Sequence, residues 1–165
     1  MKTTKTITLL LALIMTFSLL AACGDKGGEI RDDVLTADIV NDAITAVGGG
    51  DNFVDAGADY IKYSLNLAED SYAECAVRLN SEGIAIDEIG VFKGADAEMT
   101  AAIKTAVDNY INARIESWMP EYRPEEFPKL ENAEVKVLGN YVMYSIMSDE
   151  DKETVFNAFE TALEK

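Results

Sequence analysis

The residue types best suited to chemistry are few in this chain. Histidine is absent, which excludes His-assisted serine or cysteine catalysis, the zinc motifs that need His, and the commonest general base. No serine stands three residues before a lysine, so the Ser-x-x-Lys signature of penicillin-interacting enzymes is missing too. The sequence therefore predicts no catalytic residues, no cofactor and no metal, and it leaves Cys23 and Cys75 as the residues to explain.

Cys23 follows the features of an export signal. Lys2 and Lys5 give a short basic start, residues 7–20 are apolar, and Leu20-Ala21-Ala22 places small residues directly before the cysteine. This pattern resembles the lipobox of bacterial lipoproteins. The resemblance implies a thioether-linked diacylglyceryl group on Cys23 and cleavage before it, so that residues 1–22 form a signal peptide.

Two other readings of this segment are possible. The apolar run from residue 7 to 22 could be an uncleaved anchor, but it is shorter than the roughly 20 residues that span a bilayer. It could also be an ordinary secretory signal with a coincidental cysteine. The lipoprotein reading predicts attachment to the extracytoplasmic face of the cell membrane, with residues 23–33 as a flexible tether at most about 35 Å long.

The chain is strongly acidic, with 30 acidic and 14 basic residues. Such a surface repels nucleic acid and anionic lipid, so we expect no nucleic-acid partner and membrane contact through the N-terminal lipid alone. Solubility explains the charge most simply, and a site for divalent cations or basic partners is the alternative. With Cys23 lipidated, Cys75 has no partner for a disulfide; we expect it to be a buried small residue rather than a reactive thiol.

The best candidate for ligand binding is the segment that holds all three prolines, residues 119–133. Trp118, Tyr122, Arg123 and Phe127 could form a preorganised recognition surface on this stiffened loop. The alternative is that these rings close one end of the core, as buried aromatic side chains usually do in a small domain.

Two acidic segments are weaker candidates. Asp87 and Glu88 are adjacent on a predicted strand and point to opposite faces, so they form no carboxylate pair by themselves, and an ion pair or a solvated edge is expected. Residues 149–153 resemble the start of a calcium loop, but Thr154 stands where that loop needs glycine. Acidic residues at a helix N-terminus explain this segment better.

The elements that would position these residues follow from hydrophobic spacing. We expect helices from Thr36 (as its cap) to about 47, over 59–65, from the Asp96 cap to about 118, ending before Pro120, and after the Ser148 cap. Residues 72–79 and 84–93 form one predicted hairpin, and residues 134–138 and 141–147 another. Gly90 suggests a bulge or the close approach of another backbone.

This order predicts a single α+β domain over residues 34–165. An N-terminal helix is followed by two ββα units, which make a four-stranded, largely antiparallel sheet with helices packed on one face.

Several motifs also resemble a known family. Residues 87–93 (DEIGVFK), 122–126 (YRPEE), 130–133 (LENA) and 139–142 (GNYV), in this order after a lipobox, resemble a mostly Gram-positive lipoprotein family catalogued as domain of unknown function 4358. The resemblance covers about residues 34–160. It implies domain limits and location, and no residue inherits a role from it.

Three functions are compatible with these features. The first is a non-enzymatic envelope lipoprotein that binds an extracytoplasmic protein, peptide or small ligand. The second is an envelope hydrolase or metal-assisted enzyme, which should show converging acids with raised pKa values. The third is a structural or assembly lipoprotein, which should show a broad exposed apolar patch.

Overall fold

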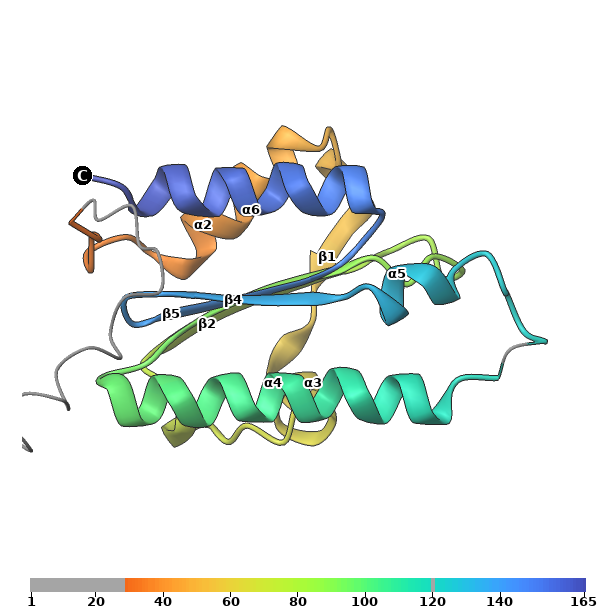
Figure 1. The fold of residues 1–165 in the computed structure, drawn as a ribbon, viewed down its shortest axis with the longest axis horizontal. Coiled ribbons are helices and arrows are strands. Elements are labelled where there is room, and N and C mark those ends of the chain that lie inside the picture. The colour runs from red at the N-terminus through yellow and green to blue at the C-terminus, as the bar shows by residue number, and fades with distance from the viewer. Residues whose placement is uncertain (1–28, 120) are drawn as a thin grey trace, which may run out of the picture.

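The computed structural model describes residues 29–119 and 121–165. The predictions for the signal peptide, for Cys23 and for a helix stop at Pro120 lie outside the described residues. Within them, a sheet of five strands runs through the middle of the molecule with helices above and below it (Figure 1). No helix in this part of the chain is long and apolar enough to cross a membrane.

Five helices and five strands make up the described part of the chain. The helices are α2 (Thr36–Ala46), α3 (Gly57–Ser64), α4 (Ala97–Ser117), the short α5 (Phe127–Glu131) and α6 (Asp149–Leu163). The strands are β1 (Phe53–Asp55), β2 (Glu74–Asn80), β3 (Glu88–Lys93), β4 (Glu134–Leu138) and β5 (Tyr141–Ile146). They lie in the order β1-β2-β3-β5-β4, and every neighbouring pair is antiparallel.

The predicted α+β class is confirmed, but two of its details are wrong. The sheet has five strands rather than four, because the three residues of β1 pair with the end of β2. The helices cover both faces of the sheet rather than one (Figure 1). Every residue of β5 is buried, as are five of the six in β3, and a strand buried on both sides needs a layer of helices on each.

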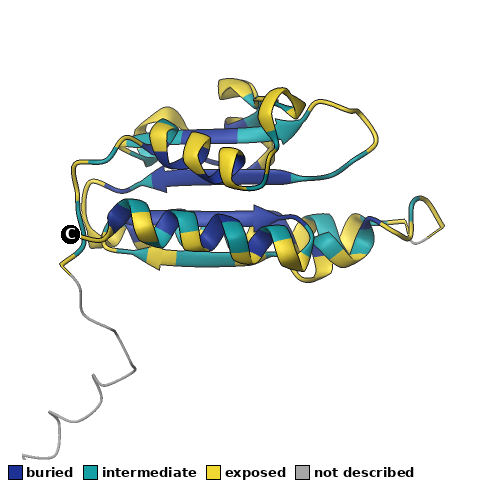
Figure 2. Cartoon of the chain, turned by 90° about the horizontal axis from the view of Figure 1, so that it is seen from above, coloured by how far each residue is buried: buried dark blue, intermediate teal, exposed yellow. Residues whose placement is uncertain are grey.

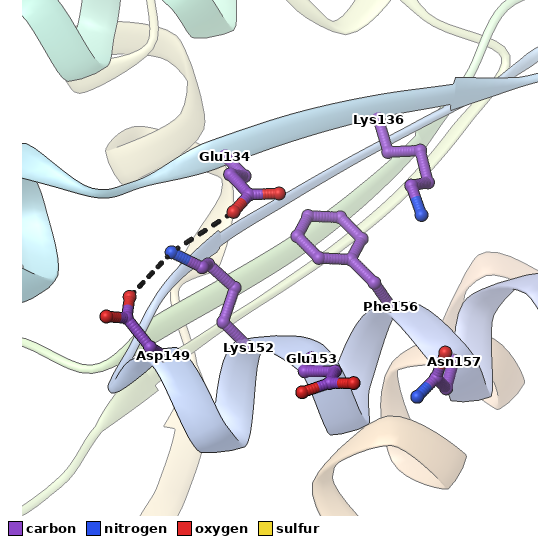
Figure 3. Close-up of a pocket in the computed structure, with 7 residues that line it drawn as sticks. All are labelled: Glu134, Lys136, Asp149, Lys152, Glu153, Phe156 and Asn157. Carbon is purple, nitrogen blue, oxygen red and sulfur yellow. Dashed lines mark hydrogen bonds and ion pairs between the residues drawn. The ribbon is translucent and has the colours of Figure 1, made fainter.

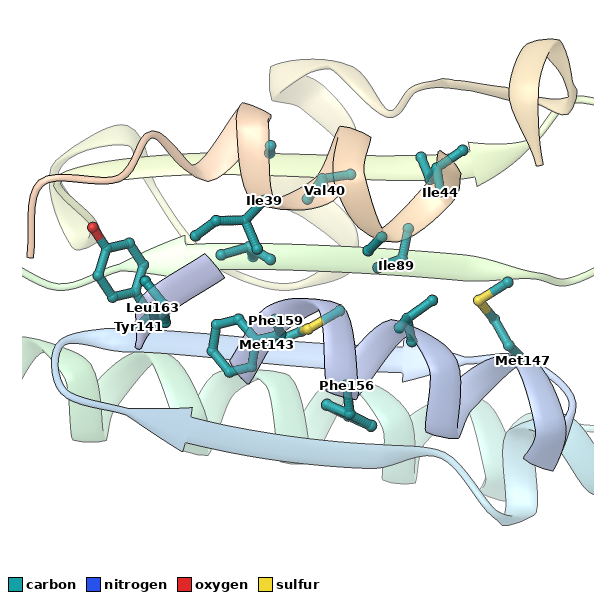
Figure 4. Close-up of a cluster of buried hydrophobic side chains, with 14 residues drawn as sticks. Ile39, Val40, Ile44, Ile89, Tyr141, Met143, Met147, Phe156, Phe159 and Leu163 are labelled. Atoms are coloured by element: carbon teal, nitrogen blue, oxygen red, sulfur yellow. The ribbon is translucent and has the colours of Figure 1, made fainter. Parts of the chain in front are cut away.

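One face of the sheet packs against α2 and α6. The side chains buried there are apolar and interlock between the two helices and the central strands (Figure 4). Phe159 of α6 and Ile39 of α2 are fully buried in this layer. We call this the α2/α6 face; its buried residues are Ile39, Val40, Ala43, Ile44, Ala76, Ile89, Val91, Tyr141, Met143, Met147, Val155, Phe156, Phe159 and Leu163.

The opposite face packs against α3 and α4, and we call it the α4 face. The connection from β3 to β5 runs through α4, which brings the long helix across the two central strands. The buried apolar residues here are Ile61, Leu65, Leu67, Val77, Phe92, Ile103, Val107, Tyr110, Ile111, Leu130, Val142, Tyr144 and Ile146.

The helix starts were predicted with mixed success. Asp96 and Ser148 cap α4 and α6 as expected, since their side chains accept the N–H groups of Met99 and Asp151. The cap expected at Thr36 is wrong, because α2 begins after Leu35. Thr36 is buried, and both its N–H and its hydroxyl donate to the carboxylate of Glu74 on β2.

Both predicted hairpins are present, with a longer connection between β2 and β3 than expected. The proline-containing segment is less irregular than predicted, because it includes α5. Cys75 is half-buried and free among the described residues, and burial raises the pKa of its thiol. Burial is highest along the central strands and falls toward the outer helix surfaces (Figure 2).

Part of the predicted tether lies against the domain. Ile30 forms an isolated bridge with Glu164, and the N–H of Arg31 donates to the carbonyl of Leu163 at 2.8 Å. The described chain therefore starts beside the end of α6.

Candidate functional site

A charged group lies inside the core of the α4 face. Glu88, the first residue of β3, is 1% exposed. Its Oε2 accepts from Nη1 of Arg114 at 2.6 Å and from the hydroxyl of Tyr110 at 2.7 Å, and its Oε1 accepts from the hydroxyl of Tyr144 at 2.5 Å. The Tyr60 hydroxyl completes the set, 3.0 Å from Oε2. A buried carboxylate needs this degree of compensation, since an unpaired one would cost several kcal/mol.

The tyrosines of this cluster are held in their neutral form. Burial, with the neighbouring Glu88 carboxylate adding to it, raises the pKa of Tyr60 to about 12. The same two causes raise the pKa of Tyr110, and they raise that of the fully buried Tyr144 well above its ordinary range. Each hydroxyl therefore remains a hydrogen-bond donor at neutral pH.

Gly90 makes room for this arrangement. It pairs with Tyr144 across β3 and β5, and a Cβ at Gly90 would lie 2.2 Å from Cε1 of the Tyr144 ring. The register on both sides of β3 is continuous, so the expected bulge is absent. The close approach predicted at Gly90 is present, but the group that approaches is the Tyr144 side chain rather than another backbone.

Arg114 connects the buried cluster to the surface. Its Nη1 is used by Glu88 and by the Tyr110 hydroxyl at 2.7 Å, whereas its Nε and Nη2 make no hydrogen bond to any described residue. The Arg114 side chain is 25% exposed. Guanidinium has five N–H donors, so three of them remain for another acceptor.

Arg114 also lines a small cavity at the C-terminal end of α4. The cavity has a volume of about 170 Å³, and we call it the Trp118 cavity. Its lining residues are Arg114, Ser117, Trp118, Met119 and Tyr122. At roughly 30 Å³ per water, this space equals five or six water molecules, which is enough for one small group.

The walls of the Trp118 cavity are largely apolar. Met119 and Tyr122 are 65% and 66% exposed, and they lie three residues apart in the chain. The other large exposed apolar side chains are dispersed over separate segments: Leu35, Val54, Tyr63, Ile84 and Val137. The indole N–H of Trp118 is buried and has no hydrogen-bond partner among the described residues. An unsatisfied donor of this kind costs about 1–3 kcal/mol.

The structure divides the four residues predicted for binding into two pairs. Trp118 and Tyr122 both line the cavity, the first half-buried and the second exposed. Phe127 lies behind the cavity, where its ring stacks on that of Trp118 at a centroid distance of 5.9 Å. Arg123 does not line the cavity; it forms an ion pair with Glu125 at 3.3 Å. The structure thus places two of the four residues around the cavity, and ligand binding by them stays a prediction.

The loop that carries Tyr122 is bonded to the connection between β2 and β3. Glu126 is buried, and it accepts the N–H of Ile86 at 3.0 Å and Nζ of Lys129 at 3.1 Å. Burial alone would raise the pKa of Glu126, but these two hydrogen bonds outweigh burial and lower it. Arg123 has a φ of +63°, a left-handed conformation that costs a non-glycine residue about 1 kcal/mol or more. The loop is thus held in one geometry beside the cavity.

The weaker acidic candidates have structural roles. Asp87 forms an ion pair with Lys129 at 3.0 Å, and Glu88 forms one with Arg114, as the ion-pair expectation for both residues predicted. Asp149 and Asp151 lie in the first turn of α6. Over residues 29–119 and 121–165, no three or more Asp, Glu or Cys side chains are placed to hold a metal ion.

Sequence reasoning missed Arg114, Met119 and the buried environment of Glu88. One signal was available: Arg114 follows Tyr110 by one turn and Val107 by two, which places a charge on the apolar side of α4. A charge there needs a buried acid as its partner. The sequence does not show which acid, because Glu88 is 26 residues away and meets Arg114 only after the chain turns back.

The comparisons with known proteins concern the family alone. No curated protein and no solved structure matches the chain. A family model described as domain of unknown function (DUF4358) matches residues 50–148. That span includes all of the Glu88 cluster and all of the Trp118 cavity. The chain therefore belongs to the family of the domain of unknown function DUF4358.

Proposed function

We propose that the chain is a lipid-anchored envelope protein that binds a small ligand group in the Trp118 cavity. The observation that carries this proposal is the set of free donors beside apolar walls. Among the described residues, no group accepts the N–H groups on Nε and Nη2 of Arg114, and Met119 and Tyr122 supply exposed apolar surface in the same cavity. The matching ligand combines an oxygen acceptor, such as a carboxylate, with an apolar or aromatic group.

The buried cluster supports this role by fixing the arginine. Nη1 of Arg114 is held by Glu88 and Tyr110, so the guanidinium plane is set before a ligand arrives. Preorganised donors bind better because less side-chain entropy is lost on binding. Glu88 also balances the charge of Arg114, so we expect recognition by hydrogen bonds and shape more than by net charge.

The cavity contains the only tryptophan of the chain, so its occupation can be read directly from intrinsic fluorescence. We would titrate the full-length protein in detergent with phenylacetate, and with phenethylamine as a cation of similar shape. Phenylacetate should change the Trp118 emission saturably and phenethylamine should not. The conservative change Arg114→Lys should weaken binding about tenfold, since lysine lacks the planar set of donors.

Two controls separate binding from damage to the fold. Tyr63→Ala removes an exposed ring on α3, outside the cavity, and should leave the phenylacetate response unchanged. Tyr122→Ala should weaken binding without changing the melting temperature. An equal response to both probes, or no response to either, would contradict the proposal.

The lipid anchor has its own test. Bacteria that express the full chain would be grown with radiolabelled palmitate, and a Cys23→Ser variant would serve as the matched control. The wild type should carry the label and sediment with membranes, and the variant should do neither. An unlabelled wild-type protein would refute the anchor while leaving the Trp118 cavity untouched.

A further inference from the structure

The free edge of the sheet at β4 has two cavities beside it, one on each face. The cavity on the side of α6 has a volume of about 330 Å³, and Glu134 and Lys136 of β4 contribute to its wall. The cavity on the side of α4 has a volume of about 370 Å³, and Val135 contributes to it. In Figure 3, Glu134 and Lys136 project from β4 toward α6, which carries the other labelled residues of the first cavity.

The backbone of β4 has hydrogen-bonding groups to offer along this edge. Leu138 and Tyr141 flank the two-residue turn at Gly139-Asn140, so they form a hydrogen-bonded pair and the pattern alternates from there. The N–H and C=O groups of Val135 and Val137 then point away from β5. Among the described residues, no backbone hydrogen bond joins β4 to any segment other than β5.

We propose that β4 binds an extended peptide as a sixth strand. Successive side chains of such a strand point to opposite faces of the sheet, so they would enter the two cavities in turn. The opposite edge is a poorer template, because β1 is only three residues long. This inference is independent of the Trp118 cavity.

The charges around the edge favour a peptide with basic side chains. On the α6 side, Lys152 is 8% exposed, whereas Glu134 and Asp149, its two carboxylate partners, are 59% and 75% exposed. The charge presented to solvent is therefore mainly negative. On the α4 side, Ile115 and Val135 are half-buried, and Lys104, Asp108, Asn112 and Glu131 make the rest of the wall mainly polar. A strand that points basic side chains toward α6 and small side chains such as valine toward α4 matches both sides.

A second copy of the chain fits this edge less well. An antiparallel pair of β4 strands centred on Lys136 would place the same lysine of each copy opposite the other. Each chain also carries a net charge of −16, which opposes self-association.

The test uses Val137, which is 38% exposed and whose N–H faces outward. Val137→Pro removes that donor without touching the β4–β5 ladder, and proline is tolerated on edge strands in this orientation. Val137→Thr, which keeps the N–H, is the matched control. The probe is a seven-residue synthetic peptide of alternating valine and lysine, compared with one of alternating valine and glutamate.

Binding to the full-length protein would be measured by interferometry and mapped by amide hydrogen exchange. The valine–lysine peptide should slow exchange over residues 134–138, and Val137→Pro should weaken its binding about tenfold while Val137→Thr changes it less than about twofold. Glu153→Lys, an exposed change in the wall of the α6-side cavity, should also weaken binding, and added salt should weaken it further.

Results of two kinds would overturn the inference, the first from peptide binding and the second from self-association. One is equal or absent binding of both peptides, or binding that Val137→Pro leaves unchanged. The other is a dimer of the peptide-free protein, seen by sedimentation and abolished by Val137→Pro, which would assign the edge to a second copy. Circular dichroism of Val137→Pro verifies that the variant is folded, and Glu153→Lys keeps the test valid if it is not.

Discussion

The cores on the two faces of the sheet differ in the kind of side chain that they bury. On the α2/α6 face, the core is a continuous set of apolar side chains around the buried hydroxyl of Ser145, which has no hydrogen-bond partner among the described residues. On the α4 face, the core encloses the Glu88 carboxylate with three tyrosines and Arg114. Packed apolar side chains stabilise a fold directly. A buried ion pair often stabilises it no more than hydrophobic residues of similar size would.

The binding role that we propose for the Trp118 cavity would explain why the α4 face contains a charged cluster. The polar cluster ends at the Trp118 cavity, where Arg114 has donors to spare. On the α2/α6 face the charged groups lie at the edge of the layer, where Lys152 is bonded to Asp149, Glu134 and the carbonyl of Asn132. If the two faces differ in this way, the changes with the largest effects should lie in the charged cluster of the α4 face.

The largest effect is expected from Glu88→Ala. The change removes the buried carboxylate from Arg114 and Tyr144, and it leaves the hydroxyls of Tyr60 and Tyr110, which lie 2.5 Å apart, with only each other as acceptors. The free energy of unfolding should therefore fall by about 3–5 kcal/mol. Chemical denaturation measures the loss, with Glu82→Ala in the exposed β2–β3 connection as a control that should change little. The double change Glu88→Leu with Arg114→Met should cost less than Glu88→Ala. If Glu88→Ala were as mild as the control, the cluster would not be a charged core.

Gly90→Ala should have the next largest effect, about 1–3 kcal/mol, because the new Cβ overlaps the ring of Tyr144. The cause can be isolated in a Tyr144→Leu background, where the ring is gone and the added methyl should cost much less. Equal costs in the two backgrounds would show that Gly90 is needed for its backbone and not for the cluster.

High pH should weaken the α4 face selectively. A tyrosine whose pKa is raised in the folded state stabilises the fold fully below its unfolded pKa, near 10, and loses this contribution as the pH rises through its folded pKa. For Tyr60 that interval is from about 10 to about 12. Thermal melting between pH 8 and 11 should show falling stability above pH 10.

The matched variants sharpen this test. Tyr60→Phe should fall less steeply with pH than the wild type, because one of the raised groups is gone. Tyr63→Phe, an exposed position outside the cluster, should follow the wild type. If the stability of Tyr60→Phe fell with pH as steeply as that of the wild type, the titration of Tyr60 would not be a cause of the alkaline unfolding.

The smallest effect is expected where the two faces are alike. Ile39→Val on the α2/α6 face and Ile103→Val on the α4 face each remove one methylene from a fully buried site. Each should cost about 0.5–1.5 kcal/mol, at pH 7 and at pH 10 alike. A much larger cost at Ile103 would mean that the polar cluster depends on the surrounding apolar packing.

The sequence predicted the local structure of this molecule better than its layers. Asp96 and Ser148 mark helix starts because a cap is a contact between residues three apart. The two-residue turn at Gly139-Asn140 fixes the β4–β5 hairpin in the same local way. The second layer of helices was not predicted, because β3 and β5 become neighbours only through the long connection that contains α4.

The residues of the candidate site show the same contrast between local and long-range features. Trp118 and Tyr122 were predicted because aromatic residues on a proline-containing loop are visible in the sequence. Arg114 was not, because its role depends on Glu88, and the pair forms only when α4 crosses β3. Phe127 does not line the cavity, and its ring stacks on that of Trp118, a contact that the sequence does not show.

The most direct test of the account is to locate a ligand in the Trp118 cavity. Crystals of the protein would be soaked in phenylacetate and the bound molecule placed in the electron density. We expect the carboxylate to lie about 3 Å from Nε or Nη2 of Arg114, with the ring against Trp118 and Met119. Phenylacetate bound only elsewhere, or a saturating soak that leaves no ligand density beside Arg114, would contradict it.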